Sequence, residues 1–149
     1  MWDLSSQRLV IPALGSLYRG AAPFTETAIR IVAGLSLVPH GYPKLFVNPE
    51  ASATFLANSG YTPGMFWAIL LGLTEFVGGL LLAAGFLTRL ACLPIFIFLL
   101  TAIGYHWQFG FPWNDRGFEY PLFWAIVVLH FLIHGGGRYS VDRLLGREV

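Results

Sequence analysis

Residues Pro63–Leu87 read PGMFWAILLGLTEFVGGLLLAAGFL and contain one charged side chain, Glu75, at their midpoint. At a rise of about 1.5 Å per residue, a helix of this length crosses the hydrocarbon core of a bilayer, which is roughly 30 Å thick. A carboxylate at that depth costs roughly 3 kcal/mol unless it faces protein or a water-filled cavity. The segment therefore predicts a transmembrane helix whose Glu75 points into the protein and is the first candidate functional residue.

The composition of the whole chain agrees with a membrane protein. Of its 149 residues, 56% are hydrophobic and only 11% are charged, whereas soluble domains carry about 25% charged residues. A net charge of +1 gives no reason to expect a nucleic acid or an acidic ligand. The single cysteine, Cys92, excludes an intrachain disulfide and a CxxC redox pair. We expect one compact domain inserted in the membrane.

Four hydrophobic segments predict an all-α fold, a four-helix transmembrane bundle. Helices are expected because every backbone polar group in lipid needs a partner within the protein. We place Thr25 and Thr62 as N-caps of the first two helices, with Pro63 at the first helical position of the second. The expected parts are an N-terminal cytoplasmic or interfacial segment at 1–23, spans at about 24–47, 63–87, 89–107 and 119–134 within a membrane domain at 24–137, and a cytoplasmic tail at 138–149.

The basic residues predict the orientation. Four spans put both termini on one side, and Lys44 and Arg116 would lie on the other. The positive-inside rule then places both termini in the cytoplasm. The basic residues expected on the cytoplasmic side are Arg8, Arg19, Arg89, Arg138, Arg143 and Arg147.

The depth of each polar residue predicts a site in the outer half of the bundle. Counting about 1.5 Å per residue from the middle of each span places His40, Lys44, Tyr105 and His106 above Glu75. Two interpretations of Glu75 stay open: a role in ligand or proton handling, or a buried carboxyl that fixes helix packing with Arg30 or His40 as its partner. For Lys44 we favour snorkelling to the outer interface over ligand contact. Trp67, Phe76 and Tyr105 are the expected aromatic walls.

A second pair, His130 and His134, has the four-residue spacing of metal ligands on one helical face. The glutamate and third histidine of a zinc-protease helix are missing, so we predict no metal site. Haem is also not expected, because only His40 and His106 lie at matched depth and they lie near the surface. The chain shows no Ser–His–Asp arrangement and no phosphate-binding loop. We therefore expect no self-sufficient active site.

Three motifs together resemble the DoxX family of bacterial and archaeal membrane proteins, with a likeness that runs from about Ile29 to Arg143. The resemblance implies a four-helix protein of the cytoplasmic membrane, with Lys44, Glu75 and Arg89 at the family's charged positions. Some relatives are linked to thiosulfate:quinone oxidoreductase and others to complexes that handle thiol or oxidative stress. The motifs are His40–Phe46 (HGYPKLF), Glu75–Leu82 (EFVGGLLL) with Gly85 and Thr88–Arg89, and Gly135–Asp142 (GGGRYSVD).

Three functions follow as hypotheses. The first is an accessory membrane subunit of an oxidoreductase system that binds a quinone, or docks a redox partner, in the outer half of the bundle. The second is a structural or assembly subunit that docks on a larger complex through the aromatic loop 108–118. The third is a small-solute or proton transporter with Glu75 as the carrier. The expected partners are the lipid bilayer and other membrane subunits or a second copy of the chain.

Overall fold

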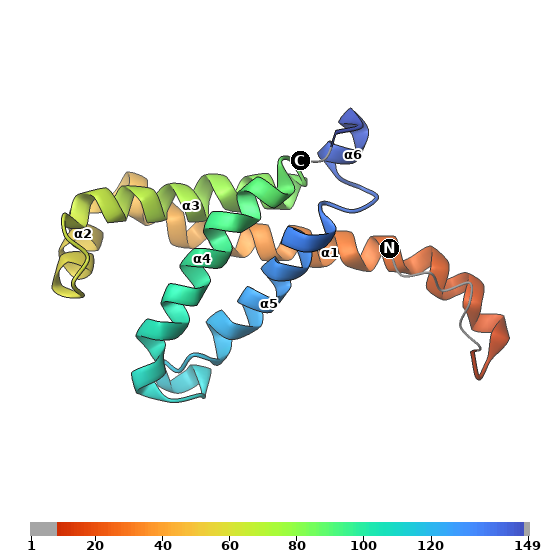
Figure 1. Ribbon diagram of the computed structural model, residues 1–149, viewed down its shortest axis with the longest axis horizontal. Helices are drawn as coiled ribbons and strands as arrows, with labels where there is room; N and C mark the ends of the chain where they lie inside the picture. The colour runs from red at the N-terminus through yellow and green to blue at the C-terminus, as the bar shows by residue number, and fades with distance from the viewer. Residues whose placement is uncertain (1–8, 148–149) are drawn as a thin grey trace.

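The computed structural model of the chain describes residues 9–147 and shows a helical protein with no strand among them (Figure 1). Helices α1, α3 and α4 are long and apolar enough to cross a membrane. Helix α5 is apolar but shorter, about 24 Å at 1.5 Å per residue. The all-α prediction and its four long helices are thus confirmed. The α-helices are α1 (Gly15–Tyr42), α2 (Pro49–Asn58), α3 (Gly64–Ala84), α4 (Thr88–His106), α5 (Glu119–His134) and α6 (Val141–Leu145).

Several expected helix boundaries are wrong. Helix α1 begins at Gly15 and runs through Pro23, so the Thr25 hydroxyl bonds the Ala22 carbonyl inside the helix and caps nothing. Helix α3 begins at Gly64, and Pro63 takes the N-cap position in an extended conformation. The end of the expected first span forms a π-helical turn, η2 (Pro43–Val47), and the segment between the first two expected spans contains α2. Arg8, and the last two residues of the expected tail, lie outside the described residues.

Helices α1 and α3 lie antiparallel and side by side (Figure 1). Glycines make this approach possible. A Cβ added at Gly79 would lie 2.6 Å from the Gly34 carbonyl oxygen, and one added at Gly41 would lie 2.5 Å from the Phe76 nitrogen. Small residues thus let α1 and α3 pack closely, as is usual between membrane helices.

Helices α4 and α5 form a second pair that diverges from the α1–α3 pair (Figure 1). We call the end of the bundle that carries η2, α2 and the loop 107–118 the loop end. We call the opposite end, where the α3–α4 turn meets α6, the clasp end. The two helix pairs meet near the clasp end and separate toward the loop end.

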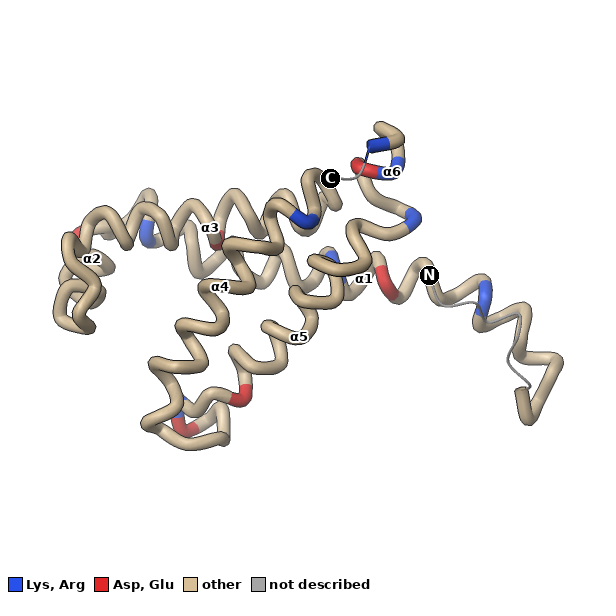
Figure 2. The backbone as a smooth tube through the Cα atoms, in the orientation of Figure 1, with Lys and Arg blue, Asp and Glu red and all other residues tan. Residues whose placement is uncertain are grey.

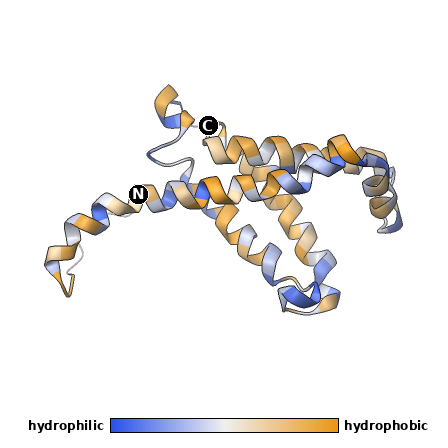
Figure 3. Ribbon diagram, turned by 180° about the vertical axis from the view of Figure 1, so that it is seen from behind, coloured by the Kyte–Doolittle hydropathy of each residue, from blue (hydrophilic) through white to orange (hydrophobic). Residues whose placement is uncertain are grey.

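The core lies where the two pairs meet. It contains small and aliphatic residues from all four long helices together with Phe131. Figure 3 shows hydrophobic residues along the lengths of the long helices and hydrophilic residues in the turn between α4 and α5. Figure 2 shows charged residues mainly near helix ends and in turns, with an acidic position midway along α3. That position is Glu75, which is buried.

Candidate functional site

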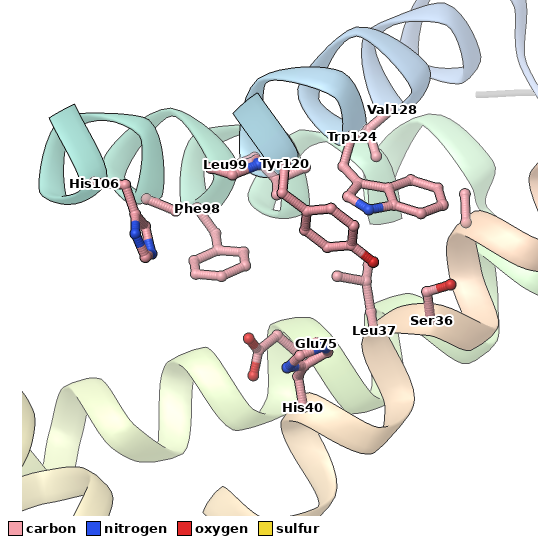
Figure 4. A pocket seen from close by; sticks show the side chains of 13 residues that line it. Ser36, Leu37, His40, Glu75, Phe98, Leu99, His106, Tyr120, Trp124 and Val128 are labelled. Carbon is pink, nitrogen blue, oxygen red and sulfur yellow. The ribbon is translucent and has the colours of Figure 1, made fainter. Parts of the chain in front are cut away.

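A cavity of about 190 Å³ lies between the two helix pairs (Figure 4). It borders the core and extends toward His106 at the end of α4. All four long helices contribute to its wall. The lining residues are Ala33, Ser36, Leu37, His40, Glu75, Phe98, Leu99, Ala102, His106, Tyr120, Pro121, Trp124 and Val128.

The two walls of the cavity differ in chemistry. Figure 4 shows His40 and Glu75 on the side of α1 and α3, and Tyr120 and Trp124 facing them from α5. The cavity is partly open, and two residues of its wall are exposed: His40 and, by 52%, Tyr120.

The partner of Glu75 is Lys44. The Lys44 Nζ lies 2.6 Å from Glu75 Oε2, and the two side chains are 22% and 4% exposed. The same Nζ donates to the His40 carbonyl at 2.7 Å. Neither interpretation of Lys44, snorkelling or ligand contact, included this ion pair with Glu75. Arg30 and His40, the two partners considered for Glu75, do not hold its carboxylate.

The chain geometry around Pro39 explains how Lys44 reaches Glu75. Helix α1 continues past Pro39 to Tyr42 and passes directly into the π-helical turn η2. Lys44 thus stays within one turn of His40, on the side of α1 that packs against α3. Single π-helical turns within helices are frequent at functional sites.

The other predicted site residues are only partly brought together. His106 lines the cavity, and its Nδ1 contacts the Arg116 carbonyl oxygen in the turn before α5. Tyr105 does not line the cavity. Its ring packs against Phe55 of α2, with centroids 5.7 Å apart. Tyr105 therefore joins α2 to the end of α4.

The predicted aromatic walls are replaced by others. Trp67 packs on Tyr61, and Phe76 packs on Tyr42 and Phe46, all away from the cavity. The aromatic residues that do line it are Phe98, Tyr120 and Trp124. Tyr120 and Trp124 lie four apart on α5, and this spacing was the available signal that they share a face.

His130 and His134 lie outside the cavity. Their rings stack with centroids 4.3 Å apart, and His130 Nε2 lies 3.3 Å from Glu26 Oε1 of α1. Within residues 9–147, no three His, Cys, Asp or Glu side chains are grouped so that they could hold a metal ion. Through the contact of His130 with Glu26, the histidine pair links α5 to the first half of α1.

The cavity can bind and orient a polar ring. Histidine, tyrosine and tryptophan side chains there can donate hydrogen bonds, and the histidines and the Glu75 carboxylate can accept them. The aromatic wall offers flat apolar surface for stacking. The Lys44–Glu75 pair adds a group at which a proton can be held.

Three proteins are similar in sequence to this chain, and none of their names states a function. The uncharacterized membrane protein Rv3486 of Mycobacterium tuberculosis is 26% identical over 148 residues, which cover 92% of this chain and 91% of that protein. The inner membrane protein YqjF of Escherichia coli is 42% identical over 77 residues, 51% of this chain and 59% of that protein. An uncharacterized protein of Haemophilus influenzae is 30% identical over 80 residues, 53% of this chain and 52% of that protein. No solved structure matches the chain.

The family comparison is more informative. The family model named DoxX matches residues 26–109, which include His40, Lys44, Glu75 and His106. The match covers more than half of the chain and ends before α5, the helix that supplies Tyr120 and Trp124. Together with the helical membrane fold, it settles the family: the chain is a member of the DoxX family.

Proposed function

We propose that this protein binds the head group of a lipid-soluble quinone in the cavity, as an accessory membrane subunit of an oxidoreductase system. The observation that carries the proposal is a partly open cavity between apolar helices, whose wall brings together His40, Glu75 and Tyr120. A quinone presents a flat ring with a carbonyl on either side and an apolar tail. The ring needs a hydrogen-bond donor at each carbonyl and apolar walls, while the tail can remain in the bilayer.

The two walls fit these needs. His40 and Tyr120 come from opposite sides of the cavity, so each can donate to one carbonyl oxygen. Trp124 and Phe98 supply aromatic surface for the ring. When a quinone is reduced it takes up protons as well as electrons, and Glu75 lies in the same wall with Lys44 beside it. In this proposal the partner oxidoreductase supplies the electrons that reduce the quinone.

The proposal includes a location and an orientation. The relative from Escherichia coli is named as an inner membrane protein, and we place this chain in a bacterial or archaeal cytoplasmic membrane. The distribution of arginines supports cytoplasmic termini, which would put the clasp end inside and the loop end outside.

A second candidate function is an assembly subunit that docks through the loop end. It is supported by three exposed aromatic residues in the turns between α4 and α5: Trp107, Phe111 and Trp113. Under this alternative the Lys44–Glu75 pair only fixes packing. Trp113→Ala would then abolish co-purification with the partner complex, and Glu75→Gln would leave co-purification intact.

Binding of a short-chain menaquinone or ubiquinone analogue to the purified full-length protein tests the first proposal. Quinones quench tryptophan fluorescence, so a saturable loss of emission and a rise in melting temperature are expected. Ala102→Phe fills the cavity and should remove the saturable part. Leu100→Phe, at an exposed position two residues away on α4, is the matched control and should bind normally. Absence of saturation in the wild type, or unchanged binding by Ala102→Phe, would reject the proposal.

A further inference from the structure

We infer that the cavity is a half-channel, which exchanges water and protons with the loop end of the bundle through the Lys44–Glu75 pair and is sealed from the clasp end. The inference concerns access to the cavity and does not depend on which ligand occupies it. Three layers along the bundle carry it: the cavity, an apolar plug and a polar clasp.

The apolar plug lies on the clasp side of the cavity. Ala33, Leu99 and Val128 line the cavity and also belong to the hydrophobic core. One or two turns further along the same helices, the core continues with residues that are at most 1% exposed. Those residues are Leu82 of α3, Cys92 and Ile95 of α4, and Phe131 of α5.

The plug is longest along α4 and is one helical turn long along α1, between Ala33 and Arg30. Leu99 and Cys92 are seven residues apart, which is about 10 Å along α4. A water molecule in a protein interior needs two to four polar partners, and the packed side chains of this layer offer none beyond the thiol of Cys92. Protons therefore have no hydrogen-bonded route through the layer in this conformation.

The polar clasp closes the same end behind the plug. The buried Arg30 guanidinium donates to the carbonyl oxygens of Gly136 and Tyr139 and, at 3.4 Å, Ala83. These bonds join α1, the end of α3 and the chain after α5.

The buried Asp142 carboxylate completes the clasp. It accepts hydrogen bonds from the Leu87 and Thr88 backbone nitrogens and from the Thr88 hydroxyl, at 2.7–2.9 Å. The N-terminus of α4 is thereby tied to α6. Within residues 9–147 no buried side-chain nitrogen or oxygen lacks a hydrogen-bond partner, so the clasp offers no free group to lead water inward.

The loop end is different because a charged pair connects the cavity with the surface there. Glu75 lines the cavity and is 4% exposed, whereas its partner Lys44 is 22% exposed. His106 lines the opposite wall and contacts the Arg116 carbonyl in the polar turn before α5. Within residues 9–147, the charged and imidazole groups of the cavity wall thus connect with polar groups at the loop end, so protons would enter and leave the cavity from that side.

Sided labelling of cysteines in sealed vesicles tests the inference. In a Cys92→Ala background, Ser36→Cys of α1 and Ala102→Cys of α4 place thiols in the cavity wall. Trp113→Cys, at a position that is 66% exposed, reports the loop end, and Leu144→Cys, at a position that is 86% exposed, reports the clasp end. The probe is a positively charged, membrane-impermeant methanethiosulfonate, added to one side of oriented vesicles at a time.

Both cavity cysteines should react at least about tenfold faster from the side that labels Trp113→Cys, because the reagent needs a hydrated thiolate. Native Cys92 in the wild-type chain should stay unmodified from both sides. Equal or faster labelling of the cavity cysteines from the side of Leu144→Cys overturns the inference, and so does a failure to label them from either side.

Failure of this inference is distinguishable from failure of the quinone proposal. Sided labelling without quinone binding leaves the half-channel standing and removes the ligand. Quinone binding together with equal labelling from both sides keeps the quinone proposal and rejects the half-channel. Because Ser36→Cys and Ala102→Cys are small changes on different helices, agreement between them excludes a local folding defect as the cause.

Discussion

The Lys44 ammonium bridges the Glu75 carboxylate, at 2.6 Å, and the His40 carbonyl, at 2.7 Å. The ammonium thereby connects the start of η2 to the middle of α3 and pairs with the Glu75 carboxylate in the wall of the cavity. Removing one partner of a buried ion pair leaves an uncompensated charge, which is costlier than removing both.

Lys44→Met should therefore destabilise the protein by about 2–3 kcal/mol, somewhat below the range for fully buried pairs because Lys44 is partly exposed. Unfolding in a denaturing detergent titration measures the change. The double variant Lys44→Met/Glu75→Leu should recover part of the loss. Arg143→Met, at an exposed position, serves as the control and should change stability by less than about 0.5 kcal/mol. A Lys44→Met protein as stable as the control would show that the pair is not formed.

Close contact between α1 and α3 gives a second prediction. A Cβ at Gly79 would lie 2.6 Å from the Gly34 carbonyl oxygen, which is backbone and cannot turn aside. Gly79→Ala should force the helices apart and cost at least about 2 kcal/mol of stability. Gly104→Ala on α4 is the matched control, because nothing lies within 4 Å of its added Cβ. It should be neutral or stabilising by up to about 1 kcal/mol, since alanine favours the helix.

The clasp gives a third prediction. Asp142→Ala removes the acceptor of three hydrogen bonds and leaves the Leu87 and Thr88 backbone nitrogens without a partner. We expect a loss of about 2–4 kcal/mol and faster cleavage by trypsin after Arg143, because α6 would detach from the α3–α4 turn. Asp115→Ala, at an exposed position in the turn before α5, should change neither quantity. Unchanged protection of Arg143 would argue that α6 is held in some other way.

The sequence predicts the helices better than the site, for a physical reason. Hydrophobic length is a local property, so the four long helices could be found from the chain alone, whereas the expected N-caps Thr25 and Thr62 were wrong. Glu75 and His40 could be selected by their depth in the membrane.

The errors in the site arise because the sequence does not show how each helix is rotated about its own axis, and therefore which side chains face the cavity. The π-helical turn η2 decides where Lys44 points, and nothing local to Pro43–Val47 indicated that turn. Likewise, the divergence of α4 and α5 from α1 and α3 brings Tyr120 and Trp124 to the cavity and leaves Tyr105 outside it, packed on Phe55. Crossing angles depend on packing between distant segments, which depth counting does not include.

A histidine in the cavity wall and a histidine outside the cavity give the last prediction. His40 lines the cavity wall, whereas His134 stacks on His130 outside it. If His40 donates a hydrogen bond to a quinone carbonyl, His40→Ala should weaken binding of the quinone analogue about tenfold, which corresponds to about 1.4 kcal/mol. His134→Ala should leave the affinity unchanged and so controls for the loss of an imidazole in the membrane domain. Tyr120→Phe, which removes only a hydroxyl from the facing wall, should weaken binding by a similar factor. Equal affinities of all three variants and the wild type would mean that the ring is held by apolar contact alone. The assignment of His40 and Tyr120 as the two donors would then be wrong, even if the cavity binds the quinone.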